Sequence, residues 1–415
     1  MKRYEIALIG INGFGSVHMR AAEKLQSEGR VDIKAICETN QAMCLEKIAE
    51  LKENGVNYYR DYMEMLEKEK NLDFVVVSTP IHLHREMAVN VMERGVNVLL
   101  EKPPAVTIQD IDAIISASEK TGKLCAVDFM LTADLGFLDL KKRISEGQLG
   151  KITSIRGKGL WKRLDSYYER TPWAGKLVYG NRYVLDGTVN NPFAHLLNNM
   201  LFLADSAEEF KIKAVTAELY HAHPIEAEDT SCIRVEGYSG LELLYYATLC
   251  QSIDETPVIR VEGTNGFAEW NYNSELVINS GGHAEKMCFG GEDYFDKITR
   301  IYDNLIRTIS GMSDKLLCSI YNTRNFVLAS NGAFESSGDI HAVPSEYISR
   351  YMEDGSTATD LQNISNIIDN AFTKGKLYSE AGVPWAVGGN RIIMDGYKKF
   401  GMFLQQQSNS VAVVS

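Results

Sequence analysis

Short apolar runs alternate with amphipathic stretches over the first third of the chain. Between the runs, apolar residues such as Val17, Ala21 and Leu25 recur at the spacing of one helix face. The apolar run Phe74–Val77 is typical of a strand buried on both faces of a parallel sheet. This alternation predicts a doubly wound Rossmann sheet. The expected strands are Ile6–Ile9, Val31–Cys37, Phe74–Val77, Val96–Leu100 and Leu124–Phe129, with a short element at Val56–Tyr59, and the expected helices include Ala42–Lys52, Tyr62–Lys68, Glu86–Arg94 and Ile108–Thr121.

The pattern changes after Gly147–Ile152, where strand-like runs follow one another and are joined mainly by turn or loop residues. Such a succession predicts an antiparallel sheet. We therefore predict an α/β Rossmann domain over residues 1–125. An α+β domain for substrate binding and oligomerisation is expected over 126–415, with a large, mainly antiparallel sheet and a C-terminal segment that packs back on the first domain. Helices are expected at Phe193–Leu203, Tyr294–Ser310 and Asp360–Lys374, and Ser408–Ser415 is either a frayed tail or an edge strand.

Composition narrows the class of protein. The 415 residues are 45% hydrophobic and 24% charged, which is the balance of a globular protein. The net charge of −12 argues against a nucleic-acid partner or an anionic membrane surface. No stretch approaches the roughly 20 apolar residues of a membrane span. Seven cysteines without CxxC spacing indicate a reducing compartment, so we expect a cytoplasmic protein.

A glycine-rich loop follows the first expected strand and opens the first expected helix. Its sequence, Gly10-Ile11-Asn12-Gly13-Phe14-Gly15, is a G-x-G-x-x-G fingerprint with Asn12 at the second glycine. The first glycine permits a tight turn, the last lets the helix pack on the strand, and the helix N-terminus offers N–H groups to a pyrophosphate. Asparagine tolerates left-handed backbone angles, so the turn can survive this substitution.

An acidic residue that could bind a ribose ends the second expected strand. Glu38 lies near the offset of about 20 residues expected for this role. The residues that follow, Thr39-Asn40-Gln41, include no arginine or lysine to meet a 2′-phosphate. The loop and this acid therefore favour NAD over NADP.

Two further motifs carry a family resemblance. Ser78-Thr79-Pro80-Ile81-His82-Leu83-His84 follows the fourth strand and Glu101-Lys102-Pro103 the fifth. With the glycine loop, they resemble the glucose-fructose oxidoreductase, inositol dehydrogenase and rhizopine catabolism (Gfo/Idh/MocA) family. The resemblance implies that Ser78, Thr79, Pro80, His84, Glu101 and Lys102 lie around the cofactor. His84 is expected to support the Thr79-Pro80 turn.

The resemblance assigns a catalytic role to Lys102. In the family this lysine lies beside the nicotinamide and hydrogen-bonds the reacting hydroxyl, and the Lys102–Pro103 bond can be cis. Independently, a lysine that ends a parallel strand points into the crevice where open α/β sheets bind ligands. A lysine in such a crevice is suited to proton transfer. The alternative is that Lys102 only orders the cofactor and its loop.

The family's second catalytic group lies in a D-x-x-x-H-x-x-D pattern at a helix start. The best match here runs from Asn191 through His195 to Asn198, so the histidine is kept and both acids are replaced by asparagine. A second registration, counted from Asp186-Gly187, puts Asn190 at the histidine position. We prefer the first because it retains a histidine, whose usual pKa suits a general acid or base near neutral pH. His195 and Asn191 are thus candidate catalytic and substrate-binding residues, and the alternative for His195 is a core or capping histidine.

Residues 161–170, which we call the aromatic segment, combine aromatic rings with charged groups and are followed by Trp173. Tyr167 and Tyr168 could contact a sugar ring, since aromatic faces suit its C–H groups; a subunit interface is the alternative. His221 and His223, with Glu226 and Glu228 nearby, lack a third ligand at diagnostic spacing, and no metal is expected. No Gly-x-Ser-x-Gly motif lies in a strand–turn–helix context, so serine hydrolysis is unsupported.

These features predict an NAD-dependent dehydrogenase that acts on the CH–OH group of a sugar, sugar derivative or cyclitol. The polyol class is what the resemblance implies. Two alternatives stay open: an NAD-dependent glycosidase that acts by transient oxidation, and a cofactor-binding regulatory protein without catalysis. A homodimer or homotetramer is expected, because a broad one-sided antiparallel sheet leaves an apolar face to cover.

Overall fold

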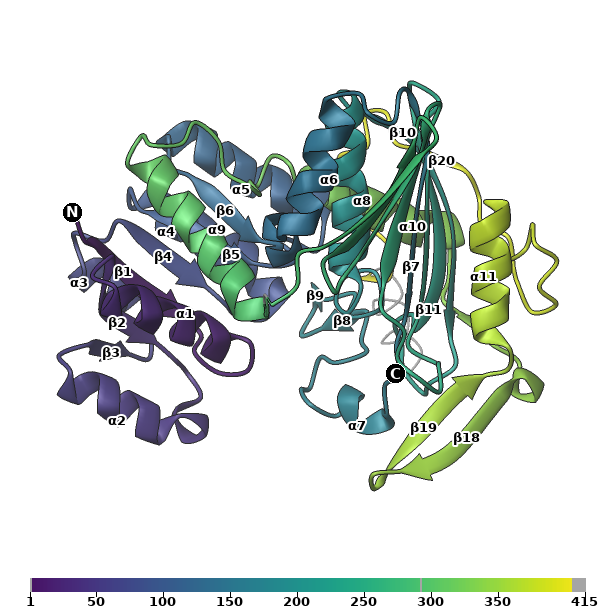
Figure 1. Cartoon of the computed structure of the whole chain (residues 1–415). Coiled ribbons are helices and arrows are strands. Elements are labelled where there is room, and N and C mark those ends of the chain that lie inside the picture. Colours follow the sequence, from purple (N-terminus) through teal and green to yellow (C-terminus); the bar gives the residue numbers. More distant parts are fainter. Residues whose placement is uncertain (1, 292, 405–415) are drawn as a thin grey trace, which may run out of the picture. The chain divides into compact units, whose positions relative to one another are not determined.

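The computed structural model describes residues 2–291 and 293–404 and consists of two compact units (Figure 1). The first unit combines the residues up to 105 with 110–133 and 291–324. The second unit comprises 106–109, 134–290 and the residues from 325 onward. The expected tail or edge strand at Ser408–Ser415 lies outside the described residues.

The first unit is built on a six-stranded, all-parallel sheet with the order β3-β2-β1-β4-β5-β6. This arrangement confirms the predicted doubly wound sheet. Its strands are β1 (Tyr4–Ile9), β2 (Val31–Cys37), β3 (Asn57–Tyr59), β4 (Phe74–Val77), β5 (Asn97–Glu101) and β6 (Cys125–Asp128). Its helices are α1 (Gly15–Ser27), α2 (Leu45–Glu53), α3 (Tyr62–Lys68), α4 (His84–Glu93), α5 (Ile108–Thr121) and α9 (Tyr294–Ile309).

Helix α9 reaches this sheet from a distant part of the sequence. It packs against α1 and β6, and Figure 1 shows α1 and α9 over the same face of the sheet. Ile298, Ile301 and Leu305 form its buried stripe, and the side chain of Asp293 caps its first turn by accepting a hydrogen bond from Asp296 N. The first unit is therefore completed by a helix that follows β16 of the large sheet in the sequence.

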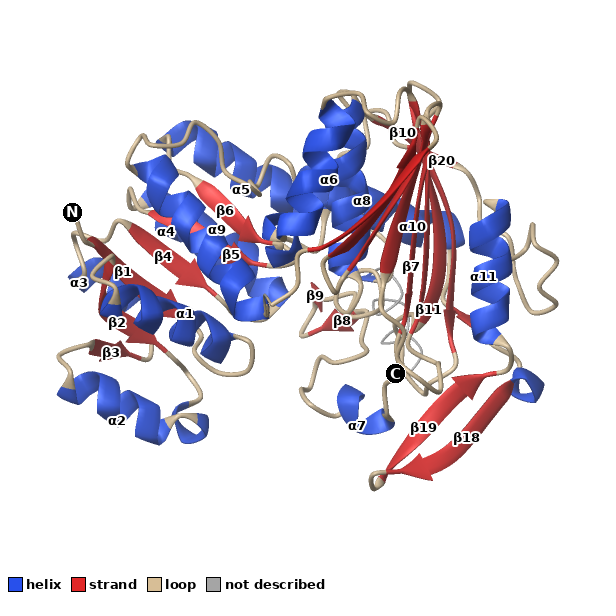
Figure 2. Cartoon of the chain, viewed as in Figure 1, coloured by secondary structure: helices blue, strands red, loops and turns tan. Residues whose placement is uncertain are grey.

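The second unit contains a ten-stranded sheet (Figure 2) with the order β16-β15-β14-β13-β7-β12-β11-β10-β17, and β20 pairs with β10. Most neighbours are antiparallel, as predicted, but β7–β12 and β10–β17 are parallel. The strands are β7 (Ile152–Leu160), β10 (Ile212–His221), β11 (Thr230–Gly237), β12 (Glu242–Thr248), β13 (Val258–Gly263), β14 (Gly266–Asn271), β15 (Glu275–Ser280), β16 (His283–Cys288), β17 (His341–Ala342) and β20 (Ile392–Ile393). Outside this sheet lie α6 (Leu135–Ser145), α7 (Asp165–Tyr168), α8 (Ala194–Ala207), α10 (Arg324–Ser337), α11 (Ile364–Lys374) and the hairpins β8 (Val178–Tyr179)–β9 (Arg182–Tyr183) and β18 (Ile348–Glu353)–β19 (Ser356–Leu361).

Two glycines in β7 let α8 lie close to the sheet. A Cβ atom on Gly159 would approach the Phe193 ring to 2.3 Å, and one on Gly157 would approach the Met200 sulfur to 2.5 Å. Alternate residues of β7 point to the other face, where the Arg156 guanidinium donates to the carbonyl of Phe372 in α11. The sheet is thus covered by α8 on one face and α11 on the other.

Helices α11 and α10 are among the elements that differ from the expectation. The predicted helix Asp360–Lys374 is wrong at its start: Leu361 ends β19, and Asn363 takes a left-handed conformation (φ 59°) before α11 begins at Ile364. Helix α10 was not predicted. Its residues Phe326–Phe334 are buried almost without interruption, so it lacks the polar face that periodicity detects. Within the described ranges, no helix combines the length and apolar character needed to cross a bilayer.

Candidate cofactor and substrate sites

The glycine loop of the first unit is shaped by two close backbone approaches. Gly10 has φ +83°, and a Cβ atom there would lie 2.3 Å from the carbonyl oxygen of Ser78, at the end of β4. A Cβ atom on Gly15 would lie 2.5 Å from the carbonyl oxygen of Gly10. Both positions therefore require glycine. The N-terminus of α1 opens at this loop, so the loop fits a pyrophosphate as the fingerprint predicts.

Asn12 does not use the left-handed conformation that its residue type allows; Gly13, with φ +55°, does. The Asn12 side-chain amide instead donates to the carbonyl oxygen of Asn40 at 3.3 Å. Asn12 therefore ties the glycine loop to the turn after β2.

Glu38 makes a second connection between the same two segments. Its carboxylate accepts from Ile11 N (3.1 Å) and from Asn40 N (2.8 Å), and its side chain is buried. A carboxylate at the end of β2, beside the glycine loop, is what binding of ribose hydroxyls requires.

His84 joins the ends of β4 and β5. Its ring nitrogens lie 2.7 Å from the carbonyl oxygen of Thr79 and 2.8 Å from that of Pro103. The Lys102–Pro103 peptide is cis, as the resemblance implied. Ser78, Thr79, Glu101 and Lys102 are thereby brought to the carboxyl ends of neighbouring parallel strands, the edge at which doubly wound sheets bind ligands.

A buried ionisable cluster lies directly beside Lys102. The His18 Nε2 atom is 3.1 Å from a Glu101 oxygen and 3.4 Å from an Asp128 oxygen, and its Nδ1 atom is 3.2 Å from the Tyr302 hydroxyl. Burial opposes charge on His18, but the hydrogen bond with Glu101 and both acidic charges outweigh it and raise the pKa of His18. Burial raises the pKa of Asp128 to about 7, against the opposing charges of His18 and Lys102.

This shift predicts how Asp128 changes stability with pH. Its pKa is about 7 in the folded chain, against 3.8 for an ordinary aspartate, so between these values the folded state binds the extra proton. The unfolding free energy of the wild type relative to Asp128→Asn should therefore fall as pH rises from about 4.5 to 6.5. Urea unfolding of both proteins across this window measures the difference. Glu119→Gln, an exposed acid on α5, is the control, and wild-type and Asp128→Asn curves that stay parallel would contradict the expectation.

In the second unit, Asn191 lies just before α8 and next to a carboxylate. Its amide nitrogen is 2.7 Å from Asp186 Oδ1 and 3.4 Å from the Tyr167 hydroxyl. Asp186 is buried, and its other oxygen accepts from Gly175 N (2.9 Å) and Arg170 (3.0 Å). The acid that the Asn191–Asn198 pattern lacks is thus present in space, contributed by a residue five positions before Asn191.

The two tyrosines of the aromatic segment have different surroundings. The Tyr167 ring has the Arg170 guanidinium 3.9 Å and the Arg163 guanidinium 5.3 Å from its centroid, and its hydroxyl faces Asn191. The Tyr168 ring instead packs on the His223 ring, with centroids 4.9 Å apart. The structure therefore brings Tyr167 together with Asn191 and places Tyr168 against a different group.

His195 lies in the first turn of α8, as the preferred registration requires, and it is 6% exposed. Asn198, one turn further on, is fully buried. In the sequence, Asp186 stands out only as the start of the other registration, and no motif includes Asp128. Position at the end of a parallel strand was the one signal that could have selected Asp128.

Comparisons with known proteins match two stretches of the chain to family models. The family model described as "Oxidoreductase family, NAD-binding Rossmann fold" matches residues 4–129, and that of the "GFO/IDH/MocA C-terminal domain" matches residues 137–269. Together they cover more than half of the chain. The first match confirms the predicted NAD-binding Rossmann domain.

Individual relatives match over shorter stretches. An inositol 2-dehydrogenase of Salmonella paratyphi B is 30% identical over 156 residues, which are 36% of this chain and 44% of that protein. An α-N-acetylgalactosaminidase of Shewanella oneidensis is 32% identical over 130 residues, 30% of this chain and 28% of that protein. The structure of a levoglucosan dehydrogenase with NADH and L-sorbose has a TM-score of 0.70 at 20% identity, over 81% of this chain and 97% of that one. At this identity the structural likeness concerns the fold alone.

Proposed function

The chain belongs to the Gfo/Idh/MocA oxidoreductase family, and from this premise we propose that it is an NAD-dependent dehydrogenase of a sugar, sugar derivative or cyclitol. The observation that carries the proposal is the edge of the parallel sheet in the first unit. There the glycine loop, Glu38 and Lys102 stand at the ends of β1, β2 and β5. NAD, when bound, supplies the acceptor for the hydride that leaves the carbinol carbon.

The residues of the chain then have separate tasks. The glycine loop and the N-terminus of α1 hold the pyrophosphate, and Glu38 holds the ribose hydroxyls. Lys102 of the first unit hydrogen-bonds the reacting hydroxyl, and His195 is the candidate acid–base group of the second unit. Because loss of a hydride from an alcohol requires loss of the hydroxyl proton, a positioned acid–base group accelerates the step.

The residues around Asn191 support a hydroxyl-rich substrate. Asn191, Asp186 and Tyr167 offer an amide, a carboxylate and a phenol within a few ångströms of one another, and Arg170 adds a guanidinium. Such a mixture of donors and acceptors beside an aromatic ring suits a polyol. A polyol is also the substrate named for the inositol 2-dehydrogenase relative.

The choice of cofactor gives a direct test. Glu38→Ala should weaken NADH binding by about 10- to 100-fold, since a hydrogen bond to a charged group contributes roughly 1.5–3 kcal/mol. NADPH binding should weaken less, because the change also removes a negative charge that repels a 2′-phosphate. Fluorescence titration of both nucleotides measures the ratio. Glu46→Ala, on the exposed side of α2, should change neither, and an unaltered NADH to NADPH preference in Glu38→Ala would contradict the role.

One relative favours a second candidate function. The α-N-acetylgalactosaminidase match supports a glycosidase that oxidises its substrate transiently and keeps its cofactor. A dehydrogenase accumulates NADH in stoichiometric excess over enzyme, whereas such a glycosidase releases a free sugar without net NADH.

The deciding experiment incubates the purified full chain with NAD and a panel of sugars, sugar acids and inositols, and follows NADH by absorbance. Parallel samples with aryl glycosides report cleavage. NADH production supports the dehydrogenase, cleavage without it supports the glycosidase, and nucleotide binding with neither leaves a non-catalytic regulatory protein. Light scattering of the same preparation tests the predicted homodimer or homotetramer.

A further inference from the structure

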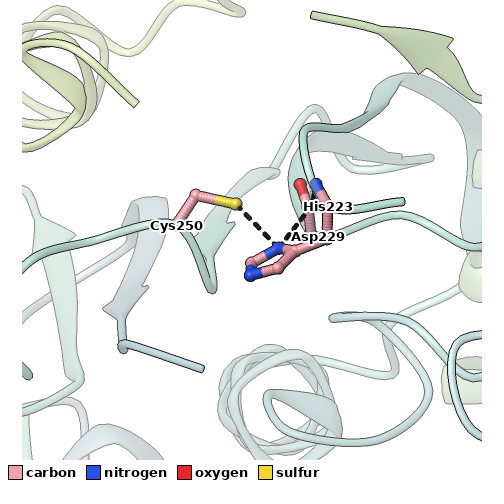
Figure 3. A group of neighbouring side chains, drawn as sticks. All are labelled: His223, Asp229 and Cys250. Carbon is pink, nitrogen blue, oxygen red and sulfur yellow. Dashed lines mark hydrogen bonds and ion pairs between the residues drawn. The ribbon is translucent and has the colours of Figure 1, made fainter. Parts of the chain in front are cut away.

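Three buried side chains meet at one end of the ten-stranded sheet (Figure 3). His223 follows β10, Asp229 precedes β11 and Cys250 follows β12. The His223 Nδ1 atom is 2.9 Å from Asp229 Oδ2 and 3.4 Å from the sulfur of Cys250. The proposed reaction uses none of these groups, so their arrangement calls for an explanation of its own.

Nitrogen, oxygen and sulfur donors at this spacing would suit a zinc ion, but their hydrogen bonds do not. Asp229 Oδ2 already accepts from the backbone nitrogens of Ala222 (2.8 Å) and His223 (2.7 Å) as well as facing the imidazole. Burial raises the pKa of the Cys250 thiol well above its ordinary value, which opposes the thiolate that a metal would need. A hydrogen bond between the His223 imidazole and the Asp229 carboxylate therefore fits these contacts better than a bound metal ion.

The surroundings of the ring indicate its protonation. Nδ1 faces the Asp229 carboxylate, and Nε2 lies 3.0 Å from the carbonyl oxygen of Arg163. Both partners are acceptors, so the pattern requires a hydrogen on each ring nitrogen. Burial opposes charge on Asp229, yet its hydrogen bonds with His223 and the charge of that ring hold its pKa below the ordinary value. The cluster is therefore an imidazolium–carboxylate pair whose opposite charges compensate each other in the core.

This pair holds the base of the aromatic segment. Nε2 of His223 donates to the Arg163 carbonyl, and the ring packs on Tyr168. On the same stretch, Trp161 N and Arg163 N donate to the carbonyl oxygens of residues 248 and 249 at the end of β12, each at a distance of 3.0 Å. Four residues beyond Arg163, Tyr167 faces Asn191.

We propose that His223 is a positioning residue for substrate binding: paired with Asp229, it holds the aromatic segment so that Tyr167 stays against Asn191. The inference rests on the proposed function, because it assigns that segment to the substrate. Loss of the pair frees the segment and weakens substrate binding, while the cofactor residues of the first unit are unaffected.

The test compares His223→Gln with His221→Gln in the full chain. His221 ends the same strand, and its ring contacts the carbonyl of residue 223 rather than the aromatic segment. In His223→Gln we expect amide hydrogen exchange in residues 161–173 to speed up at least about tenfold, with exchange in the Rossmann peptides unchanged. We also expect KM for the polyol to rise about tenfold with kcat within about threefold, and an unchanged Kd for NADH. His221→Gln should match the wild type in each measurement.

The outcomes separate this inference from the proposed function. Faster exchange confined to residues 161–173 supports the positioning role, whether or not the protein turns over a polyol. If no polyol is turned over, only the proposed function is contradicted. Unchanged exchange in these residues, or a fall in kcat with KM unchanged, overturns the inference. Exchange that rises throughout the second unit also overturns it, because His223 would then be merely structural.

A measurement on the unaltered protein covers the case in which His223→Gln does not fold. Nitrogen-15 spectra of histidine-labelled protein report both ring nitrogens, with His223→Phe or Asp229→Asn used for assignment if either folds, and the known shifts of imidazolium used otherwise. We expect the His223 ring to carry two slowly exchanging N–H groups, and His18→Gln and His84→Gln identify the signals of the other buried rings that have partners at both nitrogens. A spectrum in which every buried ring has an unprotonated nitrogen would exclude the pair.

Discussion

Replacing Lys102 by alanine should lower kcat about a thousandfold and leave the affinity for NADH within a few-fold of wild type. A positioned acid–base group contributes roughly 10²–10⁴-fold to such a reaction. Lys102 follows Glu101 at the end of β5, where the cis peptide to Pro103 and the His84 contact with the Pro103 carbonyl define its backbone. Steady-state kinetics with the best substrate, together with NADH titration, measure the two quantities separately.

Two further variants sharpen this expectation. Lys102→Arg keeps the positive charge, but its planar fork does not reproduce an ammonium, so most of the loss should remain. Lys120→Ala, on the exposed end of α5, should behave as wild type. If Lys102→Ala kept full turnover, Lys102 would only order the loop, and another group would have to hydrogen-bond the reacting hydroxyl.

Much of the first unit was predictable because its signals are local. The ranges 31–37, 62–68, 74–77 and 108–121 were predicted with the bounds that the structure has, since apolar runs and helical spacing there coincide with the elements. The glycine loop and Glu101-Lys102-Pro103 are likewise short motifs, and each can be recognised from a few consecutive residues.

Elements without such a signal were missed. Strand β16 is mostly exposed and shows no apolar alternation. It is held in the sheet by its antiparallel pairing with β15. Helix α10 is buried on nearly all sides, so no periodic stripe marks it. In both cases tertiary contacts determine the element, which a reading of local pattern does not capture.

The same limit applies to the candidate sites. Asp128 is a candidate site residue only because it forms a buried cluster with His18 and Glu101, which lie far from it in the sequence. Asp186 becomes relevant through the side chain of Asn191, and neither the D-x-x-x-H-x-x-D pattern nor composition reports that contact. The contacts of Asp128 and Asp186 were therefore not predicted, because neither residue belongs to a motif that would have signalled them.

Replacing His195 by glutamine should lower kcat by about 10²–10³-fold and remove the acidic limb of the pH–rate profile. Glutamine can still hydrogen-bond a hydroxyl from the first turn of α8, but it cannot accept a proton. Substrate binding should therefore change less than turnover. His283→Gln, at an exposed position of β16, is the matched control and should leave the profile unaltered.

Asp186 is the alternative candidate for the catalytic base, because its carboxylate lies beside Asn191. Asp186→Asn in parallel with His195→Gln separates the two. If His195 is the base, Asp186→Asn raises KM through loss of the Asn191 and Arg170 contacts but keeps the pH profile. If the profile survives in His195→Gln and disappears in Asp186→Asn, the base is the carboxylate, and the registration that begins at Asp186 is the correct one.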